Sequence, residues 1–200
     1  MTVRPTKESW LNRFASEPTP SGVTYDEILL GAPERPRLRS TVGIMSALLL
    51  FFTFATAVGQ LVNGLGWLIL RPGGEYVDWL RASAAFTTPW GMLSGHLALA
   101  MLIPGGMAVV LFVHRRHPRW LASVKPWFRW RYLLLSMGLA LVVFNLFLFL
   151  QHLGQPLPAL QPQPNYWIFL VVILLTSPLQ AAAEEFFFRG YLLQSFHSLA

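Results

Sequence analysis

The 200-residue chain contains no cysteine and few charged residues. Without cysteine, a disulfide framework, a thiolate metal site and a cysteine nucleophile are excluded, so any catalysis must use oxygen or imidazole groups. Charged residues make up 12% of the chain and hydrophobic residues 54%, whereas an ordinary soluble domain has about 25% charged residues. This composition predicts a membrane protein.

The net charge of +6 does not point to a nucleic-acid partner. The basic residues occur in short clusters between apolar runs, which is typical of contact with lipid headgroups and of membrane topology. The sequence also lacks a glycine-rich phosphate loop, a Ser-His-Asp arrangement and a nucleic-acid module. We therefore expect the lipid bilayer as a partner and no nucleic acid.

Four apolar runs predict an all-α, polytopic transmembrane bundle of about four spans, followed by a C-terminal helix with a polar motif. The spans are expected near 41–70, 90–113, 132–150 and 166–177, and the motif helix over 178–198. Pro104 and the two glycines after it interrupt the second run, so a bend is expected there. Residues 1–40 contain five prolines and mixed charges, which predicts a mostly flexible tail.

The distribution of lysine and arginine predicts the orientation of the chain. Six of these residues lie in the tail, two between spans one and two, six between spans two and three, and none before the fourth span. Because basic residues are retained on the cytoplasmic side, we expect a multi-pass protein of the cell membrane with a cytoplasmic N-terminus. The two groups of six are Arg4, Lys7, Arg13, Arg35, Arg37 and Arg39, and Arg115, Arg116, Arg119, Lys125, Arg129 and Arg131.

Two adjacent acids and an arginine interrupt the last apolar run. Glu185 and Arg189 are four residues apart, so on a helix they share a face and can form an ion pair. Glu184 is turned by about 100° from Glu185 and can point elsewhere. Counted from Tyr166, Glu184 lies roughly 27 Å along a continuous helix, near the cytoplasmic side of a hydrocarbon core about 30 Å thick. Pro178 leaves two alternatives open, a kink in one long helix or the start of a new one.

The residues around this cluster resemble a known signature. The segment Ser177-Pro178-Leu179-Gln180-Ala181, followed by Glu184-Glu185-Phe186-Phe187-Phe188-Arg189-Gly190, is similar to the first motif, Glu-Glu-x-x-x-Arg, of the CPBP family of CAAX prenyl protease-like enzymes and bacteriocin-processing or immunity proteins. The resemblance covers about twenty residues, 176–195. It implies an intramembrane metalloprotease domain, starting near residue 166, that hydrolyses peptide bonds of membrane-associated or prenylated substrates.

The resemblance also implies roles for individual residues. Glu184 would activate the attacking water as a general base or help to hold a divalent metal such as zinc. Glu185 and Arg189 would support the helix and orient Glu184. These three residues are the candidate catalytic residues.

The family continues with a Phe-x-x-x-His motif and a later His-x-x-x-Asn or His-x-x-x-Asp motif, and neither occurs in these 200 residues. We therefore expect the histidine motifs to lie outside this stretch, and the stretch alone to be inactive. His197 follows Glu184 by thirteen residues, about 20 Å along a continuous helix and on another face, so it is not expected to be the missing ligand.

The remaining polar residues of the apolar runs predict packing and not catalysis. His96, inside the second span, could face the helix bundle as a polar partner, although packing as a neutral histidine is the favoured interpretation. Asn145 is expected to hydrogen-bond to a neighbouring helix. The histidines near span ends, His114, His117 and His152, are expected to be solvated at the membrane interface.

Two other classes of function stay open. The chain could be a non-catalytic membrane scaffold or a bacteriocin-immunity-type protein in which the glutamates serve helix packing, because an acid-acid-basic cluster can also simply end a span. It could also be a small transporter or channel subunit with Glu184 as a proton or cation site, although one carboxylate cluster defines no pathway.

Overall fold

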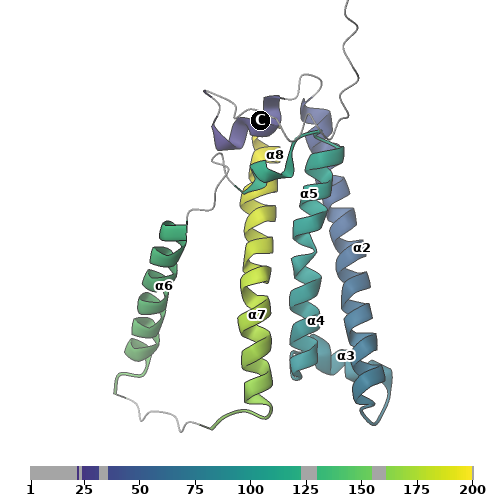
Figure 1. Ribbon diagram of the computed structural model, residues 1–200, viewed down its shortest axis with the longest axis vertical. Helices are drawn as coiled ribbons and strands as arrows, with labels where there is room; N and C mark the ends of the chain where they lie inside the picture. The colour runs from purple at the N-terminus through teal and green to yellow at the C-terminus, as the bar shows by residue number, and fades with distance from the viewer. Residues whose placement is uncertain (1–21, 23, 32–35, 123–129, 155–160, 200) are drawn as a thin grey trace, which may run out of the picture.

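The computed structural model describes residue 22 and residues 24–31, 36–122, 130–154 and 161–199. Within these ranges every regular element is a helix, which confirms the predicted all-α fold. Four helical stretches are long and apolar enough to cross a membrane, so the prediction of a multi-pass membrane protein is also confirmed (Figure 1). These stretches are Arg37–Leu70, Pro89–Phe112, Trp130–Gln151 and Tyr166–His197.

Three of the four spans pack into a bundle. Helix α2 lies against α4 and α5, and α4 lies against α7 (Figure 1). The short helix α8 continues α7 and packs against both η1 and α2. In chain order the elements are η1 (Tyr25–Gly31), α2 (Pro36–Leu70), α3 (Tyr76–Ala84), α4 (Pro89–Ala100), α5 (Leu102–Phe112), η2 (Pro118–Leu121), α6 (Trp130–Gln151), α7 (Tyr166–Glu185), η3 (Phe186–Leu192) and α8 (Leu193–His197).

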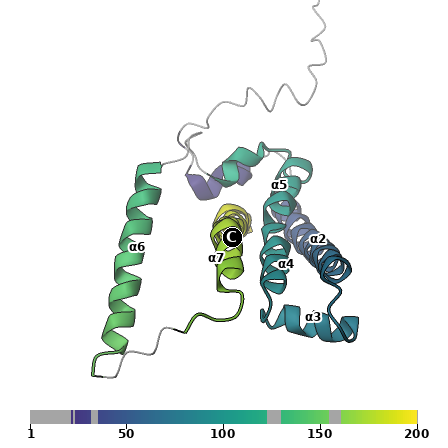
Figure 2. The same cartoon turned by 60° about the horizontal axis from the view of Figure 1, so that its bottom comes forward.

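Helix α3 runs across one end of the bundle, between the end of α2 and the start of α4 (Figure 2). Trp79 is buried, and its indole N–H donates to the carbonyl oxygen of Asn63 on α2 at 3.1 Å. Asp78 and Arg81 are exposed and form an ion pair at 3.0 Å. With one side on the bundle and charges on its exposed side, α3 has the character of a helix that lies in the membrane interface.

The expected bend of the second span is present as a break between α4 and α5. Helix α4 ends at Ala100 and α5 begins at Leu102, with Met101 between them. The break falls one turn before Pro104 because a proline has no N–H to donate to the carbonyl four residues earlier, here that of Ala100, and its ring crowds that carbonyl.

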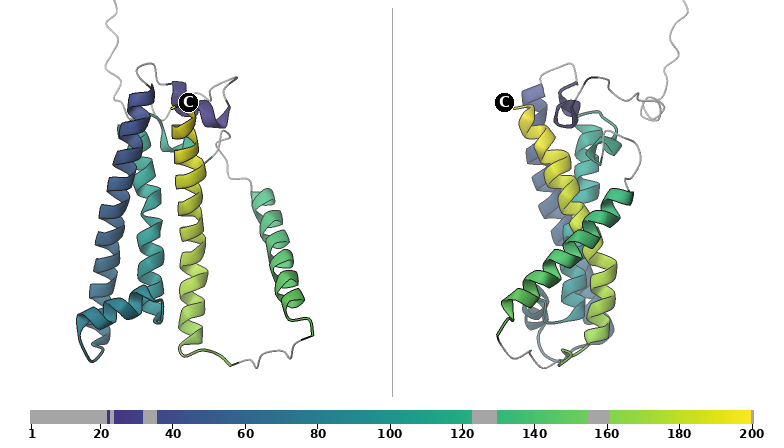
Figure 3. Two further views of the ribbon diagram at one scale, coloured as in Figure 1. Left: turned by 180° about the vertical axis from the view of Figure 1, so that it is seen from behind. Right: turned by 90° about the vertical axis from the view of Figure 1, so that its left-hand side faces the viewer.

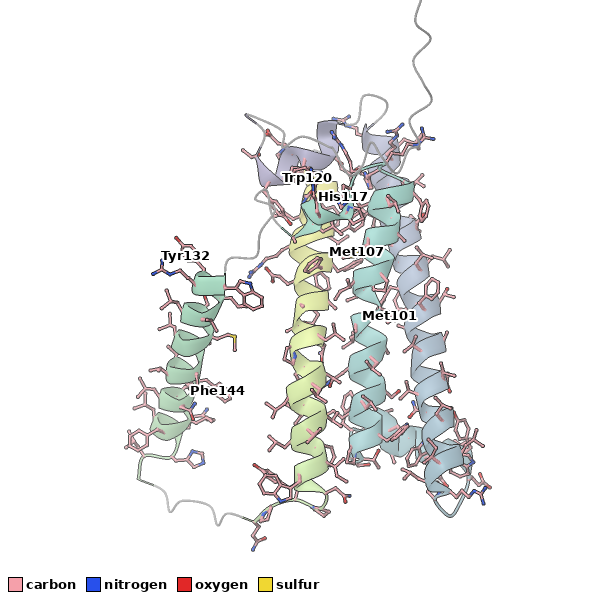
Figure 4. The ribbon with its side chains drawn as sticks, viewed as in Figure 1. Met101, Met107, His117, Trp120, Tyr132 and Phe144 are labelled. Atoms are coloured by element: carbon pink, nitrogen blue, oxygen red, sulfur yellow. The ribbon has the colours of Figure 1, made fainter. Side chains whose placement is uncertain are left out.

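Helix α6 stands apart from the bundle (Figure 3). Every residue of α6 is exposed, and side chains such as Tyr132 and Phe144 project from a helix that covers nothing (Figure 4). A span that is apolar all round is suited to lipid on every side. The prediction that Asn145 bonds to a neighbouring helix is wrong, because its side-chain amide donates to the Leu141 carbonyl of the same helix at 2.8 Å.

The alternative left open at Pro178 is settled in favour of one continuous helix. Helix α7 runs from Tyr166 to Glu185 with Pro178 inside it, so the expected division between 177 and 178 is absent. The change of winding comes later, at Phe186, where the π-helix η3 begins. Ser177, directly before Pro178, therefore lies inside the helix and does not cap a new one.

Part of the expected flexible tail is ordered. η1 packs against α8, the Tyr25 hydroxyl donates to the Leu121 carbonyl oxygen at 2.6 Å, and Asp26 lies 3.3 Å from a ring nitrogen of His197. The first span also begins at Pro36, before the expected position 41. Residues 1–21 lie outside the described part of the chain, so the prediction for them is not tested.

The two ends of the bundle differ in charge and in aromatic content. The start of α2, η2 and the start of α6 bring arginines to one end, which we call the arginine-rich end; they include Arg37, Arg39, Arg115, Arg116, Arg119 and Arg131. The opposite end carries the indole and phenol rings of Trp67, Tyr76, Trp79, Trp90, Tyr166 and Trp167. This arrangement suits a membrane protein with an aromatic interfacial belt, while the cytoplasmic location of the N-terminus stays a prediction.

Candidate functional site

The position of the carboxylates follows from how α7 packs. Phe169, Thr176 and Ala183 are the buried residues of α7, seven residues apart, and they form the seam that faces the bundle. Glu184 and Glu185 follow Ala183 directly, and both are exposed. The two glutamates therefore lie on the side of α7 that faces away from the bundle, directly after the last buried residue of the helix.

Glu185 and Arg189 form the ion pair that their spacing predicted. An Nη of Arg189 lies 2.8 Å from a carboxylate oxygen of Glu185, and the two side chains are 77% and 55% exposed. An exposed pair of this kind contributes at most about 1 kcal/mol to stability. Its main effect is to neutralise Glu185 and to fix the direction of its carboxylate.

Glu184 has a different partner. The side-chain amide of Gln180 donates to a carboxylate oxygen of Glu184 at 3.1 Å. This partner is a neutral amide and not a cationic side chain, so the contact of Glu184 differs in kind from the ion pair of Glu185. The two adjacent glutamates thus have the separate environments that a turn of about 100° allows.

The residues after the carboxylates form a π-helix, which sequence reasoning missed. η3 covers Phe186–Leu192. π-helical turns are rare in proteins, and those that occur are often found at functional sites. Its inner side is fixed by the buried Phe187 and Tyr191 and by Gly190, where a Cβ would lie 2.6 Å from the carbonyl oxygen of Leu121. A residue with a Cβ could not lie this close to η2, so the position requires glycine. Nothing in the sequence marks this contact, because Gly190 appears there simply as the residue after Arg189.

The first 3-10 helix borders the same site. Burial raises the pKa of the Tyr25 hydroxyl, a hydrogen bond with Gln194 lowers it, and the negative charge of Glu185 raises it. The hydroxyl of Tyr25 therefore lies within electrostatic reach of Glu185. η1 is thus a neighbour of the site, although it precedes Glu185 by about 160 residues in the sequence.

None of the histidines in the described ranges reaches Glu184. His96 is hydrogen-bonded to Thr176 at 2.6 Å, so of the two interpretations it takes the one of a polar partner facing the bundle. His197 faces Asp26, which agrees with its rejection as a ligand. A zinc site needs about three protein ligands, and no group of three or more His, Asp or Glu side chains able to hold a metal occurs in the described part of the chain. These residues alone do not complete a zinc site, so zinc stays a prediction.

The expectation that His114 is solvated is wrong. Its side chain is 2% exposed, and its Nε2 lies 3.3 Å from the hydroxyl of Tyr191. Gly43 faces the same two groups, and a Cβ there would collide with both. Burial, and to a smaller extent the positive charge of Arg39, lowers the pKa of His114 to about 4. His114 is therefore a neutral packing residue behind η3.

Together, the fold and the site define a multi-pass, all-α membrane protein with an exposed carboxylate pair on its last described span. No family model matches this chain, and no curated protein or solved structure matches it. The resemblance to the CAAX prenyl protease-like proteins therefore rests on the motif around Glu184 and Glu185.

Proposed function

We propose that the chain carries the glutamate half of an intramembrane endopeptidase similar to the CAAX prenyl protease-like enzymes. The substrates would be peptides held at or in the membrane, including prenylated C-termini. The observation that supports this proposal is that the two adjacent glutamates have different side-chain partners. Glu185 is paired with Arg189, whereas Glu184 is exposed on a spanning helix and, among the described residues, has the neutral amide of Gln180 as its side-chain partner.

In this proposal Glu184 is the general base. Its carboxylate accepts a proton from a water molecule as the oxygen of that water attacks the scissile carbonyl carbon, and it returns the proton to the leaving amine. Gln180 and the Glu185–Arg189 pair are positioning residues, since they hold the carboxylate and the π-helical turn. The proposal requires the two histidine motifs from chain outside these 200 residues or from a second subunit.

The test is a cleavage assay with the full coding sequence, purified into liposomes. The substrates are membrane-tethered peptides, some of them farnesylated, and mass spectrometry detects new termini. Replacing Glu184 by Gln keeps the size of the side chain and should lower the rate by about 10²–10⁴-fold, as expected for loss of a general base. Glu185→Gln is the matched control, and it should retain measurable cleavage. Equal rates for wild type and Glu184→Gln would refute the role of Glu184.

A non-catalytic scaffold or immunity-type protein is the second candidate. It is favoured by one observation: both glutamates have a side-chain partner within their own helix, four residues away, and no described histidine joins them. This candidate predicts no cleavage of any peptide in the same assay. It also predicts that Glu184→Gln and Glu185→Gln affect only stability, and to a similar extent.

A further inference from the structure

The second half of α7 carries a line of polar side chains. Thr176, Gln180 and Glu184 are four residues apart, so each lies about 6 Å further along the helix than the one before and is turned by only about 40°. Residues 168–175, in the first half of the helix, are all apolar. The polar line is therefore confined to the half of the span that leads toward the arginine-rich end.

A histidine of the neighbouring helix extends the line inward. His96 on α4 is half-buried, and its Nδ1 lies 2.6 Å from the hydroxyl oxygen of Thr176. At the outer end, Gln180 donates to Glu184 at 3.1 Å. Side chains of α4 and α7 thus form one row of hydrogen-bonding groups, from an imidazole inside the bundle to an exposed carboxylate.

The hydrogen bonds of Thr176 determine which nitrogen of His96 carries the proton. The hydroxyl of Thr176 donates to the Val172 carbonyl oxygen at 2.6 Å. Since a hydroxyl has one proton, Thr176 must accept from His96, and the N–H of the neutral imidazole is on Nδ1. Nε2 is then a bare acceptor, and no residue in the described ranges hydrogen-bonds to it.

This bare nitrogen lies deep in the membrane. Tyr166 and Trp167 are exposed at the aromatic end of α7, where such rings lie at headgroup level. Thr176 follows Tyr166 by ten residues, about 15 Å, which is the middle of a hydrocarbon core about 30 Å thick. Glu184, about 27 Å from Tyr166, is close to the opposite boundary.

Lipid cannot satisfy these groups. An acceptor without a partner is costly in hydrocarbon, and ionisable side chains in spanning helices face either other polar groups or water. Helix α6 does not cover them, because all of its residues are exposed. The line of polar side chains runs along α7 from Thr176 to Glu184, and Glu184 lies close to the membrane boundary, where water is available.

We infer that His96, Thr176, Gln180 and Glu184 line a hydrated track that opens at the arginine-rich end and reaches the middle of the bilayer. Water donates to Nε2 of His96 at the inner end and to the carboxylate of Glu184 at the outer end. The track depends on geometry and hydrogen bonding alone, so it does not require the proposed peptidase activity.

The absence of native cysteine makes a direct test possible. Single substitutions Gln180→Cys and His96→Cys are made in the full chain in native membranes, and each is exposed to a membrane-impermeant, positively charged methanethiosulfonate. Leu179→Cys and Leu97→Cys are the matched controls, one residue away from each test position. Gel filtration of every variant verifies the fold, and labelling rates are measured from each side of the membrane.

The inference predicts that Gln180→Cys and His96→Cys are labelled more than about tenfold faster than their controls, from the arginine-rich side, because a charged reagent enters water and not hydrocarbon. Rates equal to those of Leu179→Cys and Leu97→Cys would overturn the inference. Labelling of Gln180→Cys without labelling of His96→Cys would also overturn it, because the track would then end short of the imidazole. If His96→Cys does not fold, Thr176→Cys takes its place at the inner end of the track, with Leu175→Cys as its control.

Discussion

Gly190 offers a quantitative test of how η3 is held. In Gly190→Ala the new Cβ would lie 2.6 Å from the carbonyl oxygen of Leu121. A comfortable separation of carbon and oxygen is about 3.3 Å or more, so η3 and η2 must move apart by roughly 0.7 Å. The obstacle is backbone and not the end of a flexible side chain, so rotation of a side chain cannot relieve the contact.

The same carbonyl is held from a second direction. The Tyr25 hydroxyl donates to the Leu121 oxygen at 2.6 Å, and Gln194 donates to the neighbouring Trp120 carbonyl at 3.0 Å. Displacing η2 therefore strains two further hydrogen bonds. Overpacking of a well-packed site costs about 1–3 kcal/mol, while replacing a helical glycine by alanine returns up to about 1 kcal/mol.

Taking the difference between these two contributions, we expect Gly190→Ala to lower the free energy of unfolding by about 2 kcal/mol and the Tm by several degrees, at roughly 2–4 °C per kcal/mol for a chain of this size. The assay is thermal unfolding in detergent micelles, followed by tryptophan fluorescence. Gly138→Ala on α6 is the matched control, because a Cβ at Gly138 meets nothing within 4 Å; its Tm should be unchanged or slightly raised. Equal Tm values for the two variants would refute the tight contact between η3 and η2.

Three further predictions concern side chains. Because the pKa of His114 falls from 6.5 unfolded to about 4 folded, the unfolded chain binds more protons between these values. The contribution of His114 to stability is therefore complete above about pH 6.5 and declines toward pH 4 by on the order of 3 kcal/mol; thermal melts across this range should show a larger decline in wild type than in His114→Gln. Thr176→Val leaves the His96 N–H unpaired and should cost about 1–3 kcal/mol, more than Thr176→Ser in the same melts. Arg189→Ala removes an exposed ion pair with Glu185 and should cost less than about 1 kcal/mol, so a larger loss of Tm would contradict the exposed position of the pair.

Features that depend on nearby sequence could be predicted. The four spans follow from the length of apolar runs, and the Glu185–Arg189 pair follows from a spacing of four residues on a helix. The break before Pro104 was also expected, since a proline disrupts the turn that precedes it wherever it lies in a helix. In each case the cause lies within a few residues of the effect.

Features that depend on distant contacts could not be predicted. The hydroxyl of Tyr25 bonds to a carbonyl 96 residues away, and His114 is buried by Tyr191, 77 residues later. Neither partner is marked by a local pattern, so a histidine beside arginines was assigned to the interface. The π-helix belongs to the same class, because its place is set by how closely Gly190 lies against Leu121.

The two ends of the bundle have different consequences for function. At the aromatic end, the indole N–H groups of Trp79 and Trp90 donate to the α2 carbonyls of Asn63 and Val62, and Asn63 also donates to Ser94, so these groups join α2, α3 and α4 to one another. Toward the arginine-rich end, α7 exposes the carboxylate of Glu184, and its side-chain partner among the described residues is the amide of Gln180. Groups already engaged in joining helices contribute stability, whereas an exposed carboxylate is available to bind or to react. Both the proposed hydrolysis and the hydrated track therefore require access from the arginine-rich side, and a reagent or substrate confined to the aromatic side should reach neither Glu184 nor His96.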